Sequence, residues 1–111
     1  MEVSEKKIVY YVDNTKKVPF IDWLESLDVQ IKAIIKTRLD RMRRGNFGDY
    51  KSVGEGVCEL RIHLGPGYRI YFAINDHTLV LLLCGGEKRT QWKDIERAKK
   101  YWIDYRRMNY E

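Results

Sequence analysis

Side chains that bind anions or carry protons recur at every second position in the middle of this chain. Arg61 and His63 precede a Gly-Pro-Gly turn at 65–67, and Arg69 and Tyr71 follow it. A guanidinium can grip two phosphate oxygens at once, and histidine is the side chain that exchanges protons near neutral pH. The spacing therefore predicts a surface that binds an anion and transfers a proton, although polar residues on one face of a sheet can also be merely solvated.

Two strands are needed to hold these side chains on one surface. Apolar and polar residues alternate over 57–64 and over 68–74, which is the period of a half-buried strand. Glycine and proline at 65–67 favour a tight hairpin turn. A three-residue loop places Leu64 opposite Tyr68, and it predicts these cross-strand pairs: His63 with Arg69, Arg61 with Tyr71, and Glu59 with Ala73. We expect Arg69 in that position to favour the neutral, basic form of His63.

The composition restricts the class of protein. At 111 residues the chain is expected to form a single domain over residues 1–111. There are 21 Lys and Arg against 16 Asp and Glu, and the resulting net charge of +5 favours a polyanionic partner. Cys58 and Cys84 lie in apolar strand patterns and indicate buried thiols, and no motif suggests a metal site or a cofactor.

The sequence contains no stretch typical of a membrane protein. Residues 1–7 are mostly polar, and the longest apolar run, 79–84, is far too short to span a bilayer. We therefore expect a cytoplasmic protein without a membrane partner.

Further elements surround the hairpin. The predicted elements are a strand over 7–12, a helix from Pro19, a helix from Asp28 to Gly45, the start of a strand at 51–53, the hairpin, a buried strand over 78–84, a flexible basic loop over 85–89 and a helix after Thr90. The order β-α-α-β-β-β-α predicts an α+β fold. We expect an antiparallel sheet whose apolar face is covered by the helices.

A set of motifs in this order is similar to a known family over essentially the whole chain. The motifs are Gly45-Asn46-Phe47-Gly48-Asp49, Lys51, Gly56-Val57, Glu59-Leu60-Arg61-Ile62, Gly65-Pro66-Gly67-Tyr68-Arg69-Ile70-Tyr71, Gly85-Gly86-Glu87-Lys88, Gln91 and Asp94-Ile95. They resemble the HigB-like, phage-derived (Gp49-like) branch of the RelE/ParE superfamily of bacterial toxins. The resemblance implies the compact RelE-like fold. It also implies the toxin of a type II toxin–antitoxin module, held inactive by a cognate antitoxin that is a small helix-turn-helix protein.

The resemblance also suggests roles for individual residues. Toxins of the RelE type cleave messenger RNA, usually on the ribosome, by metal-free attack of the RNA's own 2′-hydroxyl on the adjacent phosphate. On that pattern Arg69 matches the arginine that stabilises the phosphate, and Lys88 matches the basic position facing the leaving group. Arg61 is a candidate second clamp or, alternatively, a cation–π partner of Tyr71. Independently of the resemblance, His63 is the candidate base because histidine exchanges protons near neutral pH; alternatively, it is an idle residue at the end of a strand.

Other residues are expected to bind RNA, and one of them, Lys51, is also an alternative candidate for the base. They are Lys51, Tyr71, Arg89 and Trp92. Trp92 stands near the place of a base-stacking tyrosine in the RelE pattern, and its alternative place is the core. Basic residues on the second and last helices either follow RNA phosphates or only confer solubility: Arg38, Arg41, Arg43, Arg44, Lys93, Arg97 and Lys100.

These expectations lead to one main hypothesis and two alternatives. The main hypothesis is an endoribonuclease (an mRNA interferase) that inhibits growth by cleaving mRNA at the ribosome. The alternatives are a ParE-like inhibitor of DNA gyrase on the same fold and a catalytically inactive co-repressor bound to its antitoxin. Replacing Arg69 by alanine is expected to abolish growth inhibition while the fold and antitoxin binding stay largely intact.

Overall fold

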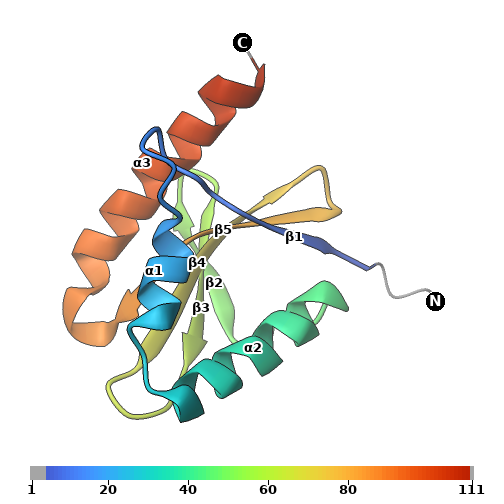
Figure 1. The fold of residues 1–111 in the computed structure, drawn as a ribbon. Helices are drawn as coiled ribbons and strands as arrows, with labels where there is room; N and C mark the ends of the chain where they lie inside the picture. The colour runs from blue at the N-terminus through green and yellow to red at the C-terminus, as the bar shows by residue number, and fades with distance from the viewer. Residues whose placement is uncertain (1–4, 111) are drawn as a thin grey trace.

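A computed structural model of the chain describes residues 5–110; Met1 to Ser4, part of the polar start, and Glu111 lie outside the described residues. The elements are β1 (Lys7–Tyr10), α1 (Pro19–Glu25), α2 (Val29–Arg43), β2 (Tyr50–Gly54), β3 (Val57–Ile62), β4 (Tyr68–Asn75), β5 (Leu79–Glu87), a 3₁₀ turn η1 (Lys88–Thr90) and α3 (Gln91–Tyr110) (Figure 1). The predicted α+β class is confirmed. Within 5–110, no helix combines the length and the apolar character needed to cross a bilayer.

The described strands form one five-stranded sheet in the order β1-β5-β4-β3-β2. β2 to β5 follow one another as antiparallel neighbours, as expected for strands joined by short turns. The sheet is nevertheless mixed, because β1 pairs with β5 in parallel. The prediction of a wholly antiparallel sheet was therefore wrong at this edge, where no turn joins the paired strands. β2 extends the predicted strand start at 51–53 into a full edge strand.

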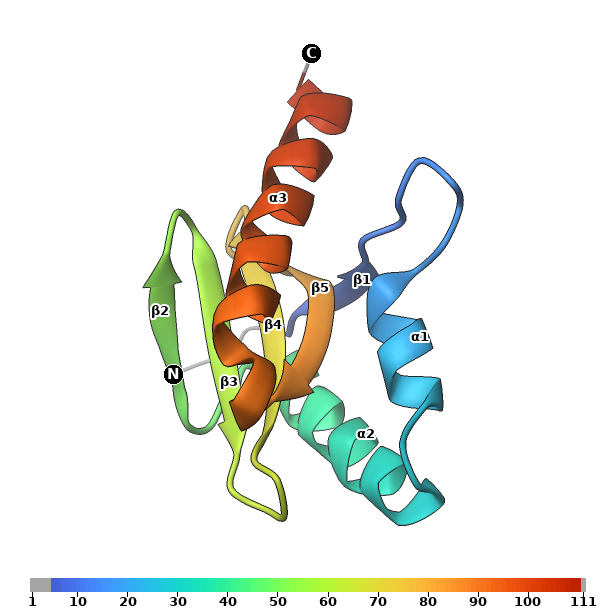
Figure 2. The ribbon, with the colours of Figure 1, turned by 90° about the vertical axis from the view of Figure 1, so that its left-hand side faces the viewer.

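Helices cover both faces of the sheet (Figure 2). α1 and α2 pack on one face, where Leu60, Ile70 and Phe72 belong to a buried cluster with residues of both helices. α3 packs on the other face, where Ala98 and Trp102 join a second cluster with Tyr71, Ala73, Leu81 and Leu83. The expectation that all helices share one face, with the other face wet, was wrong. The apolar residues of β5 bury on both faces, so the sheet needs a helical layer on each side.

The register of the central hairpin differs from the prediction by two residues. Ile62 pairs with Tyr68 and Arg61 pairs with Arg69, so the loop has five residues, 63–67, in place of three. The backbone turns tightly at the start of this loop, where Leu64 N–H donates to Ile62 O at 2.9 Å. Since a shift of two residues preserves the alternation of a strand, each side chain still points to its predicted face.

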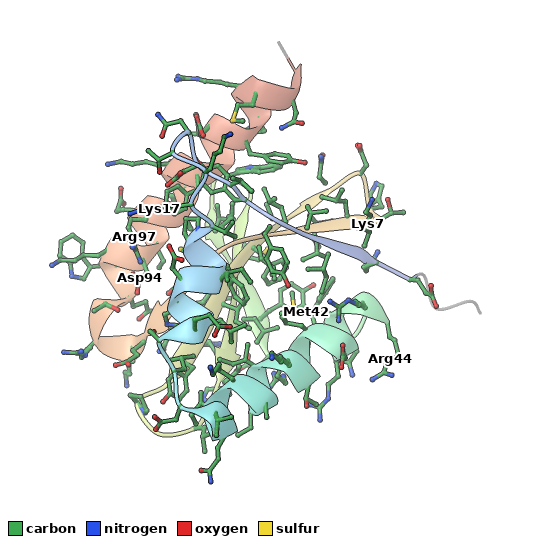
Figure 3. The ribbon with its side chains drawn as sticks, in the orientation of Figure 1. Lys7, Lys17, Met42, Arg44, Asp94 and Arg97 are labelled. Atoms are coloured by element: carbon green, nitrogen blue, oxygen red, sulfur yellow. The ribbon has the colours of Figure 1, made fainter. Side chains whose placement is uncertain are left out.

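The segment 85–87 is part of β5 and not the predicted flexible loop. A Cβ on Gly85 would stand 2.1 Å from Trp23 Cε3, and one on Gly86 would stand 1.9 Å from Asp94 Oδ2. Asp94 in turn accepts a hydrogen bond from Arg97 at 2.7 Å on α3 (Figure 3). These two glycines therefore allow α1 and α3 to pack closely on opposite faces of one strand.

Candidate active site

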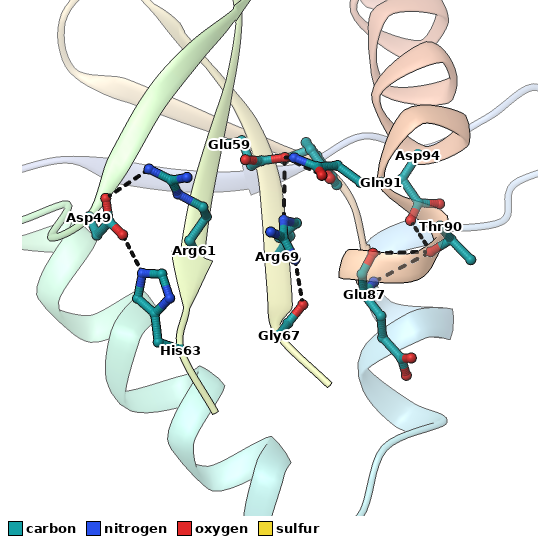
Figure 4. Close-up of polar contacts among 11 residues, drawn as sticks. Asp49, Glu59, Arg61, His63, Gly67, Arg69, Glu87, Thr90, Gln91 and Asp94 are labelled. Atoms are coloured by element: carbon teal, nitrogen blue, oxygen red, sulfur yellow. Dashed lines mark hydrogen bonds and ion pairs between the residues drawn. The ribbon is translucent and has the colours of Figure 1, made fainter. Parts of the chain in front are cut away.

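Three of the four predicted catalytic residues, Arg61, His63 and Arg69, lie at the same end of the sheet (Figure 4). Arg61 and Arg69 are direct cross-strand partners on the face toward α3. His63 lies just beyond the end of β3, and Lys88 opens η1 directly after β5. An open depression of about 330 Å³ at this end of the hairpin is lined by His63, Leu64, Gly65, Pro66, Gly67 and Lys88. The depression can therefore place a proton-transferring ring and an ammonium group beside one bound group.

Asp49, which directly precedes β2, contacts two of these residues. Its Oδ2 lies 2.5 Å from His63 Nε2, and its Oδ1 lies 3.4 Å from Arg61 Nη2. The hydrogen bond from His63 lowers the pKa of Asp49, and the charge of Arg61 adds to that lowering. The predicted pairing of His63 with Arg69 was wrong, because the longer loop carries His63 past the end of the strand to Asp49.

Arg69 is engaged inside the protein. It is only 8 % exposed, and its Nη1 donates to Gly67 O at 2.9 Å. Its Nε lies 3.6 Å from Oε2 of the fully buried Glu59. The same oxygen accepts hydrogen bonds from Tyr71 OH at 3.0 Å and from Gln91 Nε2 at 2.9 Å. Arg69 and Glu59 therefore tie β3, β4, the turn and the start of α3 together.

The residues expected to bind RNA fall into two groups. Tyr71 is fully buried and offers no surface for stacking, and burial, followed by the charge of Glu59, raises the pKa of its hydroxyl. Trp92, by contrast, is 68 % exposed, so it lies outside the core. Lys51 is exposed on β2 and is the cross-strand neighbour of Glu59. Arg89 is also exposed and pairs with Glu87 at 3.2 Å.

The basic residues of α2 and those of α3 lie on opposite sides of the molecule, because the two helices cover opposite faces of the sheet (Figure 2). Two of these basic residues already have acidic partners: Arg43 lies 2.5 Å from Asp40, and Arg97 lies 2.7 Å from Asp94. The cations of α2 and α3 therefore do not form one continuous surface. The cations at the start of α3 are the ones that follow Lys88 closely in the sequence.

Among the described residues, no group of three or more His, Cys, Asp and Glu side chains is arranged to hold a metal ion. The acids at the hairpin end are instead paired with basic side chains, Asp49 with His63 and Arg61, and Glu59 with Arg69. What the arrangement can do chemically is bind an anionic group and exchange a proton with it.

A sequence model of one protein family, described as "Phage derived protein Gp49-like (DUF891)", matches residues 22–107. The chain belongs to this Gp49-like family. The family is toxin-like and is associated with toxin–antitoxin systems. The chain is also 52 % identical over 81 residues to an uncharacterized protein of Haemophilus influenzae; the match covers 72 % of this chain and 82 % of that protein. Every predicted site residue lies within the segment that matches the family.

Two acidic residues of this Gp49-like chain have partners that the sequence did not predict. In the sequence, Asp49 stood out only as the last residue of the Gly-Asn-Phe-Gly-Asp motif, and no pattern in the neighbouring residues linked it with His63. Glu59 was visible as the one acid among the cations of the central hairpin. A lone acid on a strand face rich in cations is a signal for an internal ion pair, which the structure shows with Arg69.

Proposed function

We propose that this chain is the toxin of a type II toxin–antitoxin module and that it inhibits growth as a metal-independent endoribonuclease on mRNA at the ribosome. The association of the Gp49-like family with toxin–antitoxin systems supports the module. The observation that carries the activity is the contact of His63 and Arg61 with a single carboxylate, beside a depression that is also lined by Lys88.

The proposed reaction uses the RNA's own 2′-hydroxyl as nucleophile. His63 takes the hydroxyl proton as the oxygen attacks the adjacent phosphorus. Arg61 stabilises the additional negative charge of the crowded phosphorane, for which a permanently charged, forked donor is suited. Lys88 gives a proton to the leaving 5′-oxygen. The bond from phosphorus to that oxygen breaks, and the products end in a 2′,3′-cyclic phosphate and a 5′-hydroxyl.

In this proposal Arg69 acts differently from its predicted role. Because it is almost fully buried and tied to Glu59 and Gly67, it supports the hairpin turn and does not serve as the main phosphate ligand. Trp92 and Arg89 extend the surface next to Lys88, where an exposed indole can stack on a base and a guanidinium can meet a phosphate. We also propose that the partner is a cognate antitoxin of the small helix-turn-helix type.

The test compares two matched histidine variants. His63→Asn removes the proposed base, and His77→Asn changes an exposed histidine in the turn between β4 and β5; asparagine suits the left-handed backbone at 77, where φ is 62°. Each protein is expressed alone, growth is followed, and cellular mRNA is mapped by primer extension. Loss of a general base lowers the cleavage rate by roughly 10²–10⁴-fold, so we expect wild type and His77→Asn to cut mRNA and His63→Asn not to.

Three outcomes would contradict the proposal. Undiminished cleavage by both His63→Asn and Arg61→Gln would remove the assigned residues. Growth arrest without mRNA cleavage, accompanied by loss of gyrase supercoiling activity in vitro, would identify a gyrase inhibitor instead. Absence of any growth phenotype, with expression confirmed, would favour a co-repressor.

A further inference from the structure

Asp49 contacts two of the three proposed catalytic side chains, Arg61 and His63, each by a different carboxylate oxygen (Figure 4). We propose that Asp49 is the positioning residue of this site: it fixes the His63 ring with Nε2 turned toward the protein and Nδ1 turned toward substrate, and it sets the Arg61 guanidinium beside that ring. This inference rests on the proposed function and adds the residue that organises the site.

The segment around Asp49 is itself firmly placed. Arg61 N–H donates to Asp49 O at 2.9 Å, which continues the β2–β3 ladder by one residue. Phe47 packs on Phe72 and Tyr50, with ring centroids 5.5 Å and 5.4 Å apart, and so anchors the loop to the core. Gly48 has a φ of +67°, and a Cβ there would stand 2.8 Å from Arg38 Nη2. Glycine therefore allows the tight bend that delivers Asp49 to the end of β3.

His63 depends on such an anchor because little else restrains it. Its side chain is 73 % exposed, which is far more than an imidazole held by packing would show. The charged groups near the ring come from three segments: Asp49 before β2, Arg61 on β3, and Lys88 on η1, which lines the same depression. Of these, only Asp49 can accept a hydrogen bond from the ring.

The chemistry follows from which ring nitrogen carries the proton. A carboxylate accepts the Nε2–H bond, so the neutral ring keeps its lone pair on Nδ1. Nδ1 can then take the proton of a 2′-hydroxyl, and the imidazolium that forms is stabilised by the adjacent negative charge. The lowered pKa of Asp49 agrees with this role, since the carboxyl group stays ionised while histidine takes up and releases its proton. The proton later leaves the ring to water, and the neutral ring is restored.

A simple surface ion pair is the alternative explanation of these contacts, and the chain contains a matched control for it. Asp40 lies 2.5 Å from Arg43 on the exposed side of α2, with no histidine among its contacts. If Asp49 were only a surface pair, Asp49→Asn and Asp40→Asn would have equal and small effects on every property.

The test uses the purified full-length chain and two readouts. The first is ¹⁵N NMR of the ring nitrogens of the chain's two histidines, at a pH where both rings are neutral. We expect His63 to carry its proton on Nε2 in wild type and in Asp40→Asn, and to relax in Asp49→Ala to the tautomer mixture of His77. The second is the pH dependence of the cleavage rate on an mRNA bound to ribosomes. Misplacement of a catalytic group lowers the reaction rate roughly 10²-fold. We therefore expect the cleavage rate of Asp49→Asn to fall by about this factor and the acidic limb of its pH profile to move. We expect neither change in Asp40→Asn.

The two readouts separate this inference from the proposed function. Identical tautomer populations in wild type and Asp49→Ala overturn the inference, whatever the cleavage rates are. A wild-type rate and pH profile in Asp49→Asn overturn it as well. If wild type holds the Nε2–H tautomer through Asp49 but cleaves no RNA, the proposed function fails while the positioning of His63 by Asp49 stands.

Discussion

The pairing of Arg69 with Glu59 makes a strong prediction about stability. Arg69→Met keeps a side chain of similar length but leaves the fully buried Glu59 with only its two neutral hydrogen-bond donors. Removing one partner of a buried pair costs about 3–5 kcal/mol. Since Nε and Oε2 are 3.6 Å apart without a hydrogen bond, we expect the lower end of that range, about 3 kcal/mol. For a domain near 100 residues, this lowers the Tm by roughly 12–24 °C.

Companion variants separate the charge from the packing. Glu59→Gln still offers an oxygen to Tyr71 and Gln91, and it leaves Arg69 bonded to Gly67, so we expect a loss of roughly 1–3 kcal/mol. The double variant has no unpaired buried charge and should be more stable than the sum of the single losses predicts. The control is Arg89→Met, whose ion pair with Glu87 is on the surface; it should change stability by about 0.5 kcal/mol or less.

The assay is equilibrium unfolding of the purified proteins in urea. A loss of stability in Arg69→Met no larger than in Arg89→Met would contradict the buried charge pairing, and so would single losses that simply add in the double variant. The result also bears on function, because replacing Arg69 by alanine was expected to leave the fold intact. We now expect that substitution to destabilise the fold, so its loss of toxicity alone would not identify a phosphate ligand.

Three further predictions concern other parts of the molecule. Gly86→Ala places a Cβ 1.9 Å from Asp94 Oδ2 and should cost roughly 1–3 kcal/mol in urea unfolding, part of which Asp94→Ala in the same chain should restore; no loss would contradict the close packing. Burial raises the pKa of Cys84 to about 12, so iodoacetamide near neutral pH should alkylate the half-buried Cys58 first, as read by mass spectrometry; equal labelling would count against this. Burial, followed by a hydrogen bond to a carboxylate, raises the pKa of Tyr11 above its unfolded value. The contribution of Tyr11 to stability is therefore present below about pH 10 and is lost as the pH rises further. When the unfolding free energy is measured against pH, this loss should be smaller in Tyr11→Phe.

The local pattern of the hairpin was sufficient to predict its strands and faces but not its register. Alternation at 57–64 and 68–74 determines which side chains share a face, and a shift of two residues leaves the alternation unchanged. The length of the loop depends on hydrogen bonds within 62–67 that no propensity describes. As a result, Arg61 and Arg69 were correctly placed on one surface, while the prediction that Arg69 is the partner of His63 was wrong.

Longer-range features escaped prediction for a different reason. The contact of Asp49 with His63 exists only because β2 pairs with β3 and continues its ladder backwards by one residue. Arg69 is buried on the face that was expected to be wet and that α3 covers instead. Gly85 and Gly86 had the composition of a loop, and only the positions of α1 and α3 show that they are needed inside a strand. In each case the deciding neighbour comes from another element of the fold.

The attack of the RNA's own 2′-hydroxyl is the central claim about activity, and a single measurement tests it. The purified chain is added to ribosomes that carry a synthetic mRNA, the cut is mapped, and the same mRNA is then made with one 2′-deoxynucleotide on the 5′ side of the cut. We predict that the unmodified mRNA is cut to a 2′,3′-cyclic phosphate end and that the modified mRNA is left intact at that position. Cleavage of the modified mRNA at the same position would contradict the account.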